Sequence, residues 1–302
     1  MKPERIVKRR QFVRAGVHAG ALGSLGLLFG PRALASAGEV PVSGALKFGT
    51  TPVFLNDQLG FLGRWGPYLS NGLNLPVEFV ERRAYRDIMA LLRGGEIDAA
   101  WICGYPWVVN RQYLRGLSLP LWRGEPWYQS YLIVPANDTT TRHLRDLRGR
   151  TYAFSDPDSN SGCLVPRATL AKEGIDPDHH FGRTFFTWGH PNVVRAVGSG
   201  LANGGSVDGY VWETLQLIDP ELTKRTRVAW RSDKYGFPPL VVRGTLPVDV
   251  EVRLREVLMN MVNTAEGKAL LAALNLTGFG PFREDVFDGI AQLVEIMRSR
   301  SA

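Results

Sequence analysis

Short apolar runs alternate with amphipathic segments along most of the chain, beginning at Leu46. Residues 46–50, 77–80 and 97–102 have the length and the apolar content of buried strands. Between these runs, apolar residues recur every three or four positions, as they do on one face of a helix. Repeated alternation of strand and helix predicts an α/β architecture with mostly parallel sheets.

The alternation is interrupted by a polar segment, residues 137–141, and then starts again. Strand-like runs at 152–154, 184–186 and 207–211 are separated once more by helical patterns. Two cycles divided by a polar boundary predict two lobes, each built on one sheet flanked by helices.

The last part of the chain has the pattern of two amphipathic helices, at 248–261 and 266–274, without a third sheet. We expect these helices to complete the first lobe. The predicted divisions are residues 38–135 and 240–302 for the first lobe and residues 136–239 for the second, with the chain crossing between lobes near 131–135 and 237–242.

The first 37 residues have the pattern of an export signal. The basic segment at 8–14 resembles a twin-arginine motif, and a glycine-broken apolar stretch follows at 15–29. Small residues at 33–37 then offer a cleavage site. We expect residues 1–37 to be a signal that is cleaved near Ala37 and that directs the protein to the periplasm.

Removing this segment changes the interpretation of the charge. The full chain has 36 basic and 29 acidic residues, and residues 1–37 contain seven basic residues and one acidic residue. The remainder has 29 basic and 28 acidic residues, a net charge of +1, which does not indicate nucleic-acid binding. A mean hydropathy of −0.10 and the lack of a long apolar run argue against a polytopic membrane protein.

Nothing in the sequence indicates a metal, a cofactor or an enzyme. The two cysteines, Cys103 and Cys163, form no CxxC pair and no zinc-ligand spacing. There is no phosphate-cradling Walker loop and no evident pair of nucleophile and base. An acid–base pair of His190 and Asp208 would be needed for an enzyme, and no other feature favours one.

The most informative segment is Ser155–Cys163, which follows a strand-like run and precedes a helical pattern. A turn from strand to helix through Ser159, Asn160 and Ser161 leaves backbone N–H groups unpaired at the positive end of the helix dipole, which suits an anion. From these residues alone, a simple helix cap at Ser159 is an open alternative. Residues 103–105 and His190 also come just after strands, at the edge where such sheets bind ligands.

Five motifs, in this order along the chain, together resemble the motifs of a known protein family. They are WICGYPW at 101–107, SDPDSNSG at 155–162, FTWGH at 186–190, VDGYVWE at 207–213 and YGFPP at 235–239. Together they resemble the phosphate-, phosphite- and phosphonate-binding periplasmic proteins of ABC transporters. That family has a two-lobed, type II solute-binding fold. The CGYP segment is similar to a subgroup that reports arsenite to sensor kinases.

The resemblance implies a set of ligand-binding positions. The Ser/Thr-rich helix start that holds the oxyanion falls on Ser159, Asn160 and Ser161. The family's tyrosines fall on Tyr105 and Tyr85, and its histidine falls on His190. The acidic positions that hold a ligand ammonium group fall on Tyr210, with Asp208 nearby, and on the stretch 238–239. This departure argues against an aminophosphonate and favours a smaller ligand or one without an amine.

Several of these residues have a plain structural alternative. Tyr85 and Tyr105 could donate from their hydroxyls or could simply pack in the core. Asp208 could accept a proton from a protonated ligand oxygen or could cap a helix. Cys103 and Cys163 could be small buried side chains, ligands of a soft ion such as trivalent arsenic, or partners in a disulfide between the lobes.

We therefore expect an exported, monomeric solute-binding protein that closes on a small oxyanion and delivers it to an ABC permease. The alternative is a ligand-loaded partner of a sensor histidine kinase, binding arsenite through Cys103.

Overall fold

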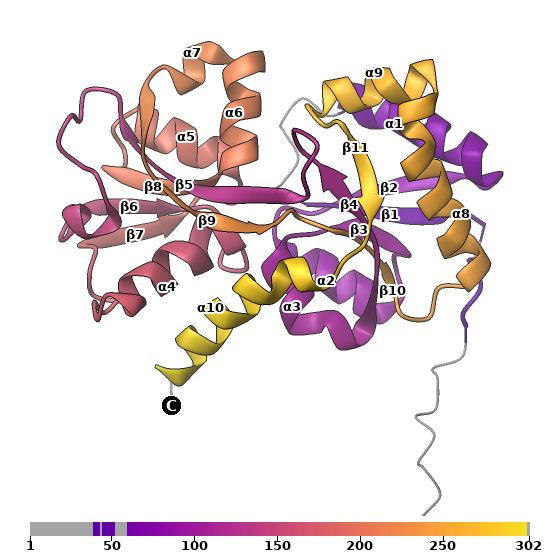
Figure 1. Ribbon diagram of the computed structural model, residues 1–302, viewed down its shortest axis with the longest axis horizontal. Helices are drawn as coiled ribbons and strands as arrows, with labels where there is room; N and C mark the ends of the chain where they lie inside the picture. The colour runs from indigo at the N-terminus through magenta and orange to yellow at the C-terminus, as the bar shows by residue number, and fades with distance from the viewer. Residues whose placement is uncertain (1–38, 43, 52–58, 301–302) are drawn as a thin grey trace, which may run out of the picture. The chain divides into compact units, whose positions relative to one another are not determined.

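The computed structural model describes residues 39–42, 44–51 and 59–300 of the 302-residue chain. These residues belong to one compact unit that contains two α/β lobes (Figure 1). The expected export signal, residues 1–37, and its cleavage near Ala37 lie outside the described residues.

The first lobe is built on a six-stranded sheet with the order β11-β4-β10-β3-β1-β2. Strand β1 lies between β2 and β3 and runs parallel to both, with Phe48 opposite Phe79 and Ala99. The other pairings are antiparallel. The strands are β1 (Leu46–Thr50), β2 (Val77–Glu81), β3 (Ala99–Trp101), β4 (Leu114–Leu121), β10 (Leu240–Arg243) and β11 (Gly278–Pro281).

The second lobe is built on a five-stranded sheet with the order β7-β6-β8-β5-β9. Strand β6 is parallel to β7 and β8, whereas β5 is antiparallel to β8 and β9. The strands are β5 (Trp127–Pro135), β6 (Thr151–Phe154), β7 (Arg183–Phe186), β8 (Gly204–Asp208) and β9 (Thr226–Gly236).

Both sheets are mixed, so the expectation of mostly parallel sheets is wrong in this detail. Strands β5 and β10 each enter their sheet directly from the other lobe. A strand that arrives this way does not need the helical crossover that joins neighbouring parallel strands. It can therefore pair in the antiparallel direction.

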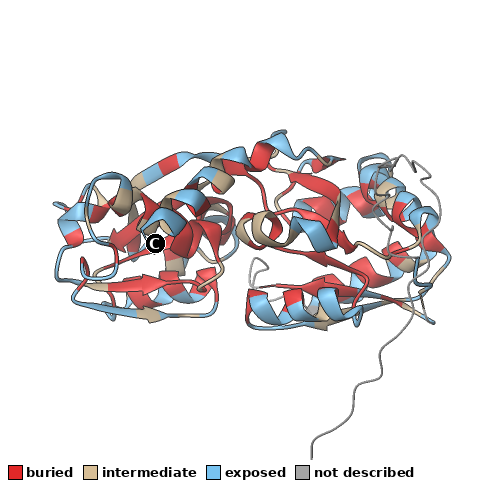
Figure 2. Cartoon of the chain, turned by 90° about the horizontal axis from the view of Figure 1, so that it is seen from below, coloured by how far each residue is buried: buried red, intermediate tan, exposed pale blue. Residues whose placement is uncertain are grey.

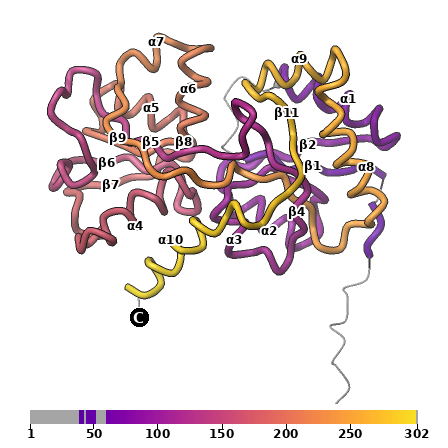
Figure 3. The backbone as a smooth tube through the Cα atoms, in the orientation of Figure 1, coloured from indigo at the N-terminus to yellow at the C-terminus, as the bar shows by residue number. Residues whose placement is uncertain are grey.

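The place of β5 also corrects the predicted boundary. Because β5 belongs to the second sheet, the chain changes sheets between Leu121 and Trp127, and not after Pro135. The return to the first sheet falls between Gly236 and Leu240, and Figure 3 shows both passages. Apolar runs look alike in either lobe, so periodicity alone did not assign β5.

Helices cover both sheets, and their apolar faces point inward. Helix α2, for example, buries Tyr85, Ile88, Met89 and Leu92. The central strands of both sheets are largely buried in Figure 2, whereas the edge strands β2 and β7 are not. The helices of the first lobe are α1 (Leu59–Leu73), α2 (Tyr85–Gly94), α3 (Gly104–Asn110), α8 (Val248–Met259) and α9 (Ala265–Ala273), and those of the second are α4 (Val165–Lys172), α5 (His190–Gly198), α6 (Gly209–Ile218) and α7 (Pro220–Thr223).

The C-terminal helix α10 (Asp288–Ser299) packs against both lobes. Its apolar face, which includes Ile290, Leu293 and Val294, is buried between α3 of the first lobe and α4 of the second (Figure 1). The assignment of all residues after 240 to the first lobe is therefore incomplete. Within the described part of the chain, no helix is long and apolar enough to cross a membrane.

Five short helical elements complete the described part of the fold. One of them, η3 (Asn160–Leu164), is a π-helical turn that leads into α4. Such turns are rare and are frequent at functional sites. The others are η1 (Arg111–Tyr113), η2 (Leu144–Leu147), η4 (Asn260–Asn263) and η5 (Asp285–Phe287).

Candidate functional site

The two lobes meet at the ends of their parallel strands. Cys103 follows β3 in the first lobe, and Ser155 follows β6 in the second. The Asn160 backbone N–H donates to the Cys103 sulfur over 3.2 Å, and the Tyr85 backbone N–H donates to Asp156 Oδ2 over 3.3 Å. Both contacts join one lobe to the other. The interlobe edge that the strand order predicts is therefore a closed interface in this structure.

Ser159 shapes the start of the helix on the second lobe. Its Oγ accepts from the Gly162 backbone N–H over 3.0 Å, and the Ser130 hydroxyl donates to the Ser161 carbonyl over 2.6 Å. A Cβ atom at Gly162 would overlap the Ser155 hydroxyl. The capping role that the sequence left open for Ser159 is therefore what its side chain does.

Four buried polar atoms at this interface have no hydrogen-bond partner among the described residues. They are the hydroxyls of Tyr85, Ser155 and Ser161 and the Oδ1 atom of Asn160. Buried polar groups are almost always paired, because desolvating an unpaired one is costly. Three of the four atoms are donors, so their arrangement suits a small group that is rich in acceptor oxygens.

Tyr128 joins these residues, although its sequence pattern indicates only core packing. It lies on β5, its side chain is buried, and its hydroxyl accepts from Asn160 Nδ2 over 2.8 Å. Its ring packs edge-on against Phe237 at the second passage between the lobes. We name Tyr85, Cys103, Tyr128, Asn160 and Ser161 the interlobe cluster. A tyrosine on a strand carries no local signal for such a contact.

His190 and Asp208 lie on adjacent elements of the second lobe. The Asp208 backbone N–H donates to His190 Nδ1 over 3.1 Å, which places the ring proton of a neutral imidazole on Nε2. Burial lowers the pKa of His190 to about 3, so the ring is neutral at pH 7. This histidine can donate one hydrogen bond but cannot supply a positive charge.

Asp208 caps helix α6, and its charge is not compensated there by a cation. Its Oδ1 atom accepts from the backbone N–H of Tyr210 over 2.9 Å. Burial raises the pKa of Asp208 to about 7 and that of Asp156 to about 6. Among the described residues, no Lys or Arg side chain hydrogen-bonds either carboxyl group. The site therefore offers hydroxyls, backbone dipoles and two perturbed acids.

Three residues expected at the site point elsewhere. The Tyr210 hydroxyl donates to the Leu274 carbonyl over 2.5 Å and so holds α6 to the end of α9. Tyr105 and Cys163 line a separate pocket of about 460 Å³ beside α10, together with Arg167 and Arg298. The spacing of strand ends groups these residues with the cluster, but the direction of each side chain depends on packing between helices.

The two cysteines are free and buried, so the disulfide alternative is wrong. Burial raises the pKa of Cys103 to about 11 and that of Cys163 to about 12, which keeps both as thiols at pH 7. Cys103 belongs to the interlobe cluster, whereas Cys163 lies at the other pocket. The described residues contain no group of His, Cys, Asp and Glu side chains that could hold a metal ion.

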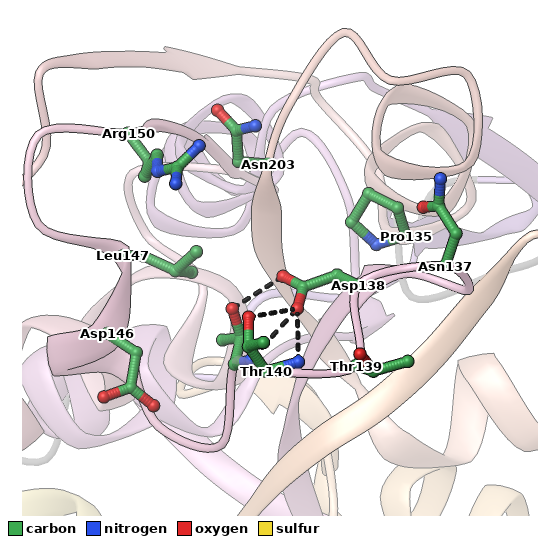
Figure 4. A pocket seen from close by; sticks show the side chains of 10 residues that line it. Pro135, Asn137, Asp138, Thr139, Thr140, Asp146, Leu147, Arg150 and Asn203 are labelled. Carbon is green, nitrogen blue, oxygen red and sulfur yellow. Dashed lines mark hydrogen bonds between the residues drawn. The ribbon is translucent and has the colours of Figure 1, made fainter.

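A further pocket lies in the second lobe, at the end of β5 where the polar segment 137–141 begins. It has a volume of about 480 Å³ (Figure 4). Asp138 organises its floor, since its carboxylate accepts from the backbone N–H groups of Thr140 and Thr141 over 2.9 Å each. None of the expected ligand-binding residues lines this pocket.

Two lobes, each built on one sheet, meet at an edge that contains buried hydrogen-bond donors. This arrangement defines a two-lobed solute-binding protein. A family model described as "ABC transporter, phosphonate, periplasmic substrate-binding protein" matches residues 48–287. The chain belongs to this family, and the expected family membership is confirmed. The likeness to arsenite-sensing proteins is not confirmed.

Individual relatives agree with this placement. The chain is 28% identical over 250 residues to the phosphonates-binding periplasmic protein of Escherichia coli, covering 79% of this chain and 72% of the relative. It is 25% identical over 248 residues to the phosphate-import protein PhnD of Mycolicibacterium smegmatis, covering 74% of this chain and 76% of the relative.

Solved structures have the same fold. A binding protein of an ABC phosphonate transporter from Pseudomonas aeruginosa superposes with a TM-score of 0.76 at 26% identity, covering 82% of this chain and 85% of that one. PhnD1 of Prochlorococcus marinus, solved with methylphosphonate, superposes with a TM-score of 0.77 at 21% identity, covering 84% of this chain and 98% of that one. The two-lobed fold expected from the motifs is confirmed.

Proposed function

We propose that this protein captures a small oxyanion of the phosphate, phosphite or phosphonate type between its lobes and delivers it to an ABC permease. The observation that carries the proposal is the group of buried, unpartnered hydroxyls of Tyr85, Ser155 and Ser161 at the interlobe edge. The names of the relatives, which refer to phosphate and phosphonates, support the same ligand class.

Each lobe contributes donors, so binding stabilises closure. Ser155 and Ser161 donate from the second lobe, and Tyr85 donates from the first. The neutral His190 adds its Nε2–H. The resemblance gives this part to both Tyr85 and Tyr105, and of the two we assign it to Tyr85, because Tyr105 lines the pocket beside α10. A ligand that contacts both lobes favours the closed state over the open one.

Asp208 gives the site a preference for ligands that carry their own proton. A carboxyl group with a pKa of about 7 is partly ionised at neutral pH and accepts a hydrogen bond from a P–OH group. Near neutral pH, the monohydrogen and dihydrogen anions of phosphate carry such a proton. The monoanions of phosphite and methylphosphonate also carry one, whereas sulfate does not. We therefore expect sulfate to bind poorly.

Calorimetric titration with phosphate, phosphite, methylphosphonate, 2-aminoethylphosphonate, sulfate and arsenite tests the proposal. We expect binding of one or more of the first three and weaker binding of the amine. Ser161→Ala should weaken the affinity about tenfold or more. Ser199→Ala is the matched control, because that hydroxyl donates to the Ala196 carbonyl on the same lobe and away from the interface. No oxyanion binding to the wild-type protein would overturn the proposal.

The partner and the location are part of the same proposal. Membership of a periplasmic substrate-binding family supports export through residues 1–37, cleavage near Ala37 and delivery to a permease. The alternative combines a sensor kinase as the partner with arsenite as a ligand of Cys103. The thiol state of Cys103 and the separate position of Cys163 do not favour this alternative.

A further inference from the structure

Helix α2 of the first lobe begins without a capping side chain of its own. Its N-cap residue is Ala84, which makes no side-chain cap hydrogen bond. The first N–H groups of a helix need acceptors, and Asp is among the best of these. Here the acceptor comes from the other lobe, because Asp156 Oδ2 accepts from the Tyr85 backbone N–H over 3.3 Å.

The acceptor is held rigidly within its own turn. Asp156 Oδ1 accepts from the Asp158 backbone N–H over 2.7 Å, and the side chain of Asp156 is fully buried. Asp158 then pairs with Arg86, the next residue of α2, at 3.2 Å on the exposed side of the interface. Two acids of one turn therefore engage two successive residues of one helix in the opposite lobe.

Both ends of this contact lead directly to the ligand site. Residues 155–158 run into Ser159, Asn160 and Ser161 without interruption. Tyr85 receives the cap through its backbone and carries one of the unpartnered hydroxyls. A shift of the Asp156 turn would therefore move Ser161 and Tyr85 relative to each other.

We propose that Asp156 is a positioning residue, a helix cap supplied across the lobes that fastens the closed state and orients Tyr85 toward the ligand. This inference rests on the proposed function for its effect on ligand release, but the cap itself acts with or without ligand. Asp156 is mostly ionised at pH 7, although burial raises its pKa to about 6, and the Tyr85 amide is the interlobe donor it meets.

The test compares three variants in the full chain. Asp156→Ala removes both acceptors, and we expect the dissociation rate of methylphosphonate to rise about tenfold. Asp156→Asn keeps a single acceptor oxygen and should show a smaller increase. Asp158→Ala is the matched control, because its pair with Arg86 is exposed to solvent and should contribute little.

A double-mutant cycle separates positioning from a general loss of structure. If Asp156 acts through Tyr85, the effects of Asp156→Ala and Tyr85→Phe on the dissociation rate will not add. Additive effects would overturn the orienting role. An unchanged dissociation rate in Asp156→Ala would overturn the inference as a whole.

A second measurement does not depend on the ligand. Dyes attached at the exposed positions through Asp87→Cys and Asp178→Cys report the distance between the lobes by energy transfer. The native Cys103 and Cys163 stay in place, because both are buried. We expect Asp156→Ala to lower the closed fraction of the ligand-free protein. If the wild-type protein binds no oxyanion but this shift is seen, the proposed ligand is wrong and the cap stands. If the closed fraction does not change, the cap is wrong.

Discussion

The Asn160 backbone N–H donates to the Cys103 sulfur over 3.2 Å and links two residues that are 57 positions apart in the chain. This amide belongs to the turn that the sequence assigns to an anion. In the closed structure a thiol of the other lobe accepts its hydrogen bond. The anion is therefore expected to rely on the hydroxyls of this region more than on that amide.

The contact predicts a mild effect of replacing the thiol. Cys103→Ser keeps an acceptor, whereas Cys103→Ala leaves the Asn160 amide unpaired and should lower the free energy of unfolding by about 1 kcal/mol. Oxyanion affinity should change by less than about threefold in both variants. Urea unfolding and calorimetry measure the two quantities. Arsenite binding that is lost in Cys103→Ala would instead support the sensory alternative.

Tyr85→Phe should separate stability from binding. The variant removes a buried hydroxyl that has no partner among the described residues, so the ligand-free protein should unfold at the same or a higher urea concentration. Methylphosphonate affinity should fall about tenfold. Tyr152→Phe is the control, because the Tyr152 hydroxyl is paired with Ser206 within the second lobe. That variant should lose stability and keep its affinity.

Asp208 predicts a pH dependence of stability. Its pKa is about 7 in the folded protein and near 3.8 when unfolded, so the folded state binds the extra proton between these values. Stability therefore falls as the pH rises from 4 to 7 because of this group. Asp208→Asn cannot ionise and keeps an acceptor for the Tyr210 amide. Its gain in stability over the wild type should be larger at pH 8 than at pH 4, by an amount of order 4 kcal/mol.

Urea unfolding in phosphate-free buffer measures this difference. The lowered pKa of His190 acts in the opposite direction, since stability rises as the pH passes from about 3 to its ordinary value of 6.5. His190 is present in both proteins, so its effect cancels in the comparison. If the gain in stability is the same at pH 4 and pH 8, the pKa of Asp208 is not raised in the folded protein.

Gly162→Ala should disrupt the start of η3. The new Cβ atom would overlap the buried Ser155 hydroxyl, so the turn that carries Ser161 must move. We expect a loss of stability of about 1–3 kcal/mol, together with loss of oxyanion binding. Gly60→Ala is the control, because a Cβ atom in that turn of α1 meets nothing within 4 Å. Thermal unfolding and calorimetry of both variants test the difference.

Tyr210→Phe tests a residue that the resemblance assigned to the ligand. Its hydroxyl donates to the Leu274 carbonyl, 64 positions away, and so belongs to the contact between α6 and α9. The variant should lose about 1 kcal/mol of stability and hold its specificity between methylphosphonate and 2-aminoethylphosphonate. A change in this specificity, measured by calorimetry, would return Tyr210 to the ligand site.

The amino-acid sequence by itself determined the α/β alternation, the existence of two lobes and the turn at Ser159–Ser161. These features follow from apolar periodicity and from helix-capping residues, which act over a few neighbouring positions. The ends of strands β3 and β6 also follow from it, and with them the edge at which Cys103 and Ser155 lie. The strand expected at 207–211 instead ends at Asp208, where helix α6 begins.

Only the tertiary structure decided which side chains share that edge. It joined Tyr128 to Asn160 and Asp156 to Tyr85, directed Tyr105 to the pocket beside α10 and paired Tyr210 with Leu274. It also placed β5 in the second sheet. The hydrogen bonds among these contacts join residues 32 to 71 positions apart, and such packing leaves no periodic trace in either segment.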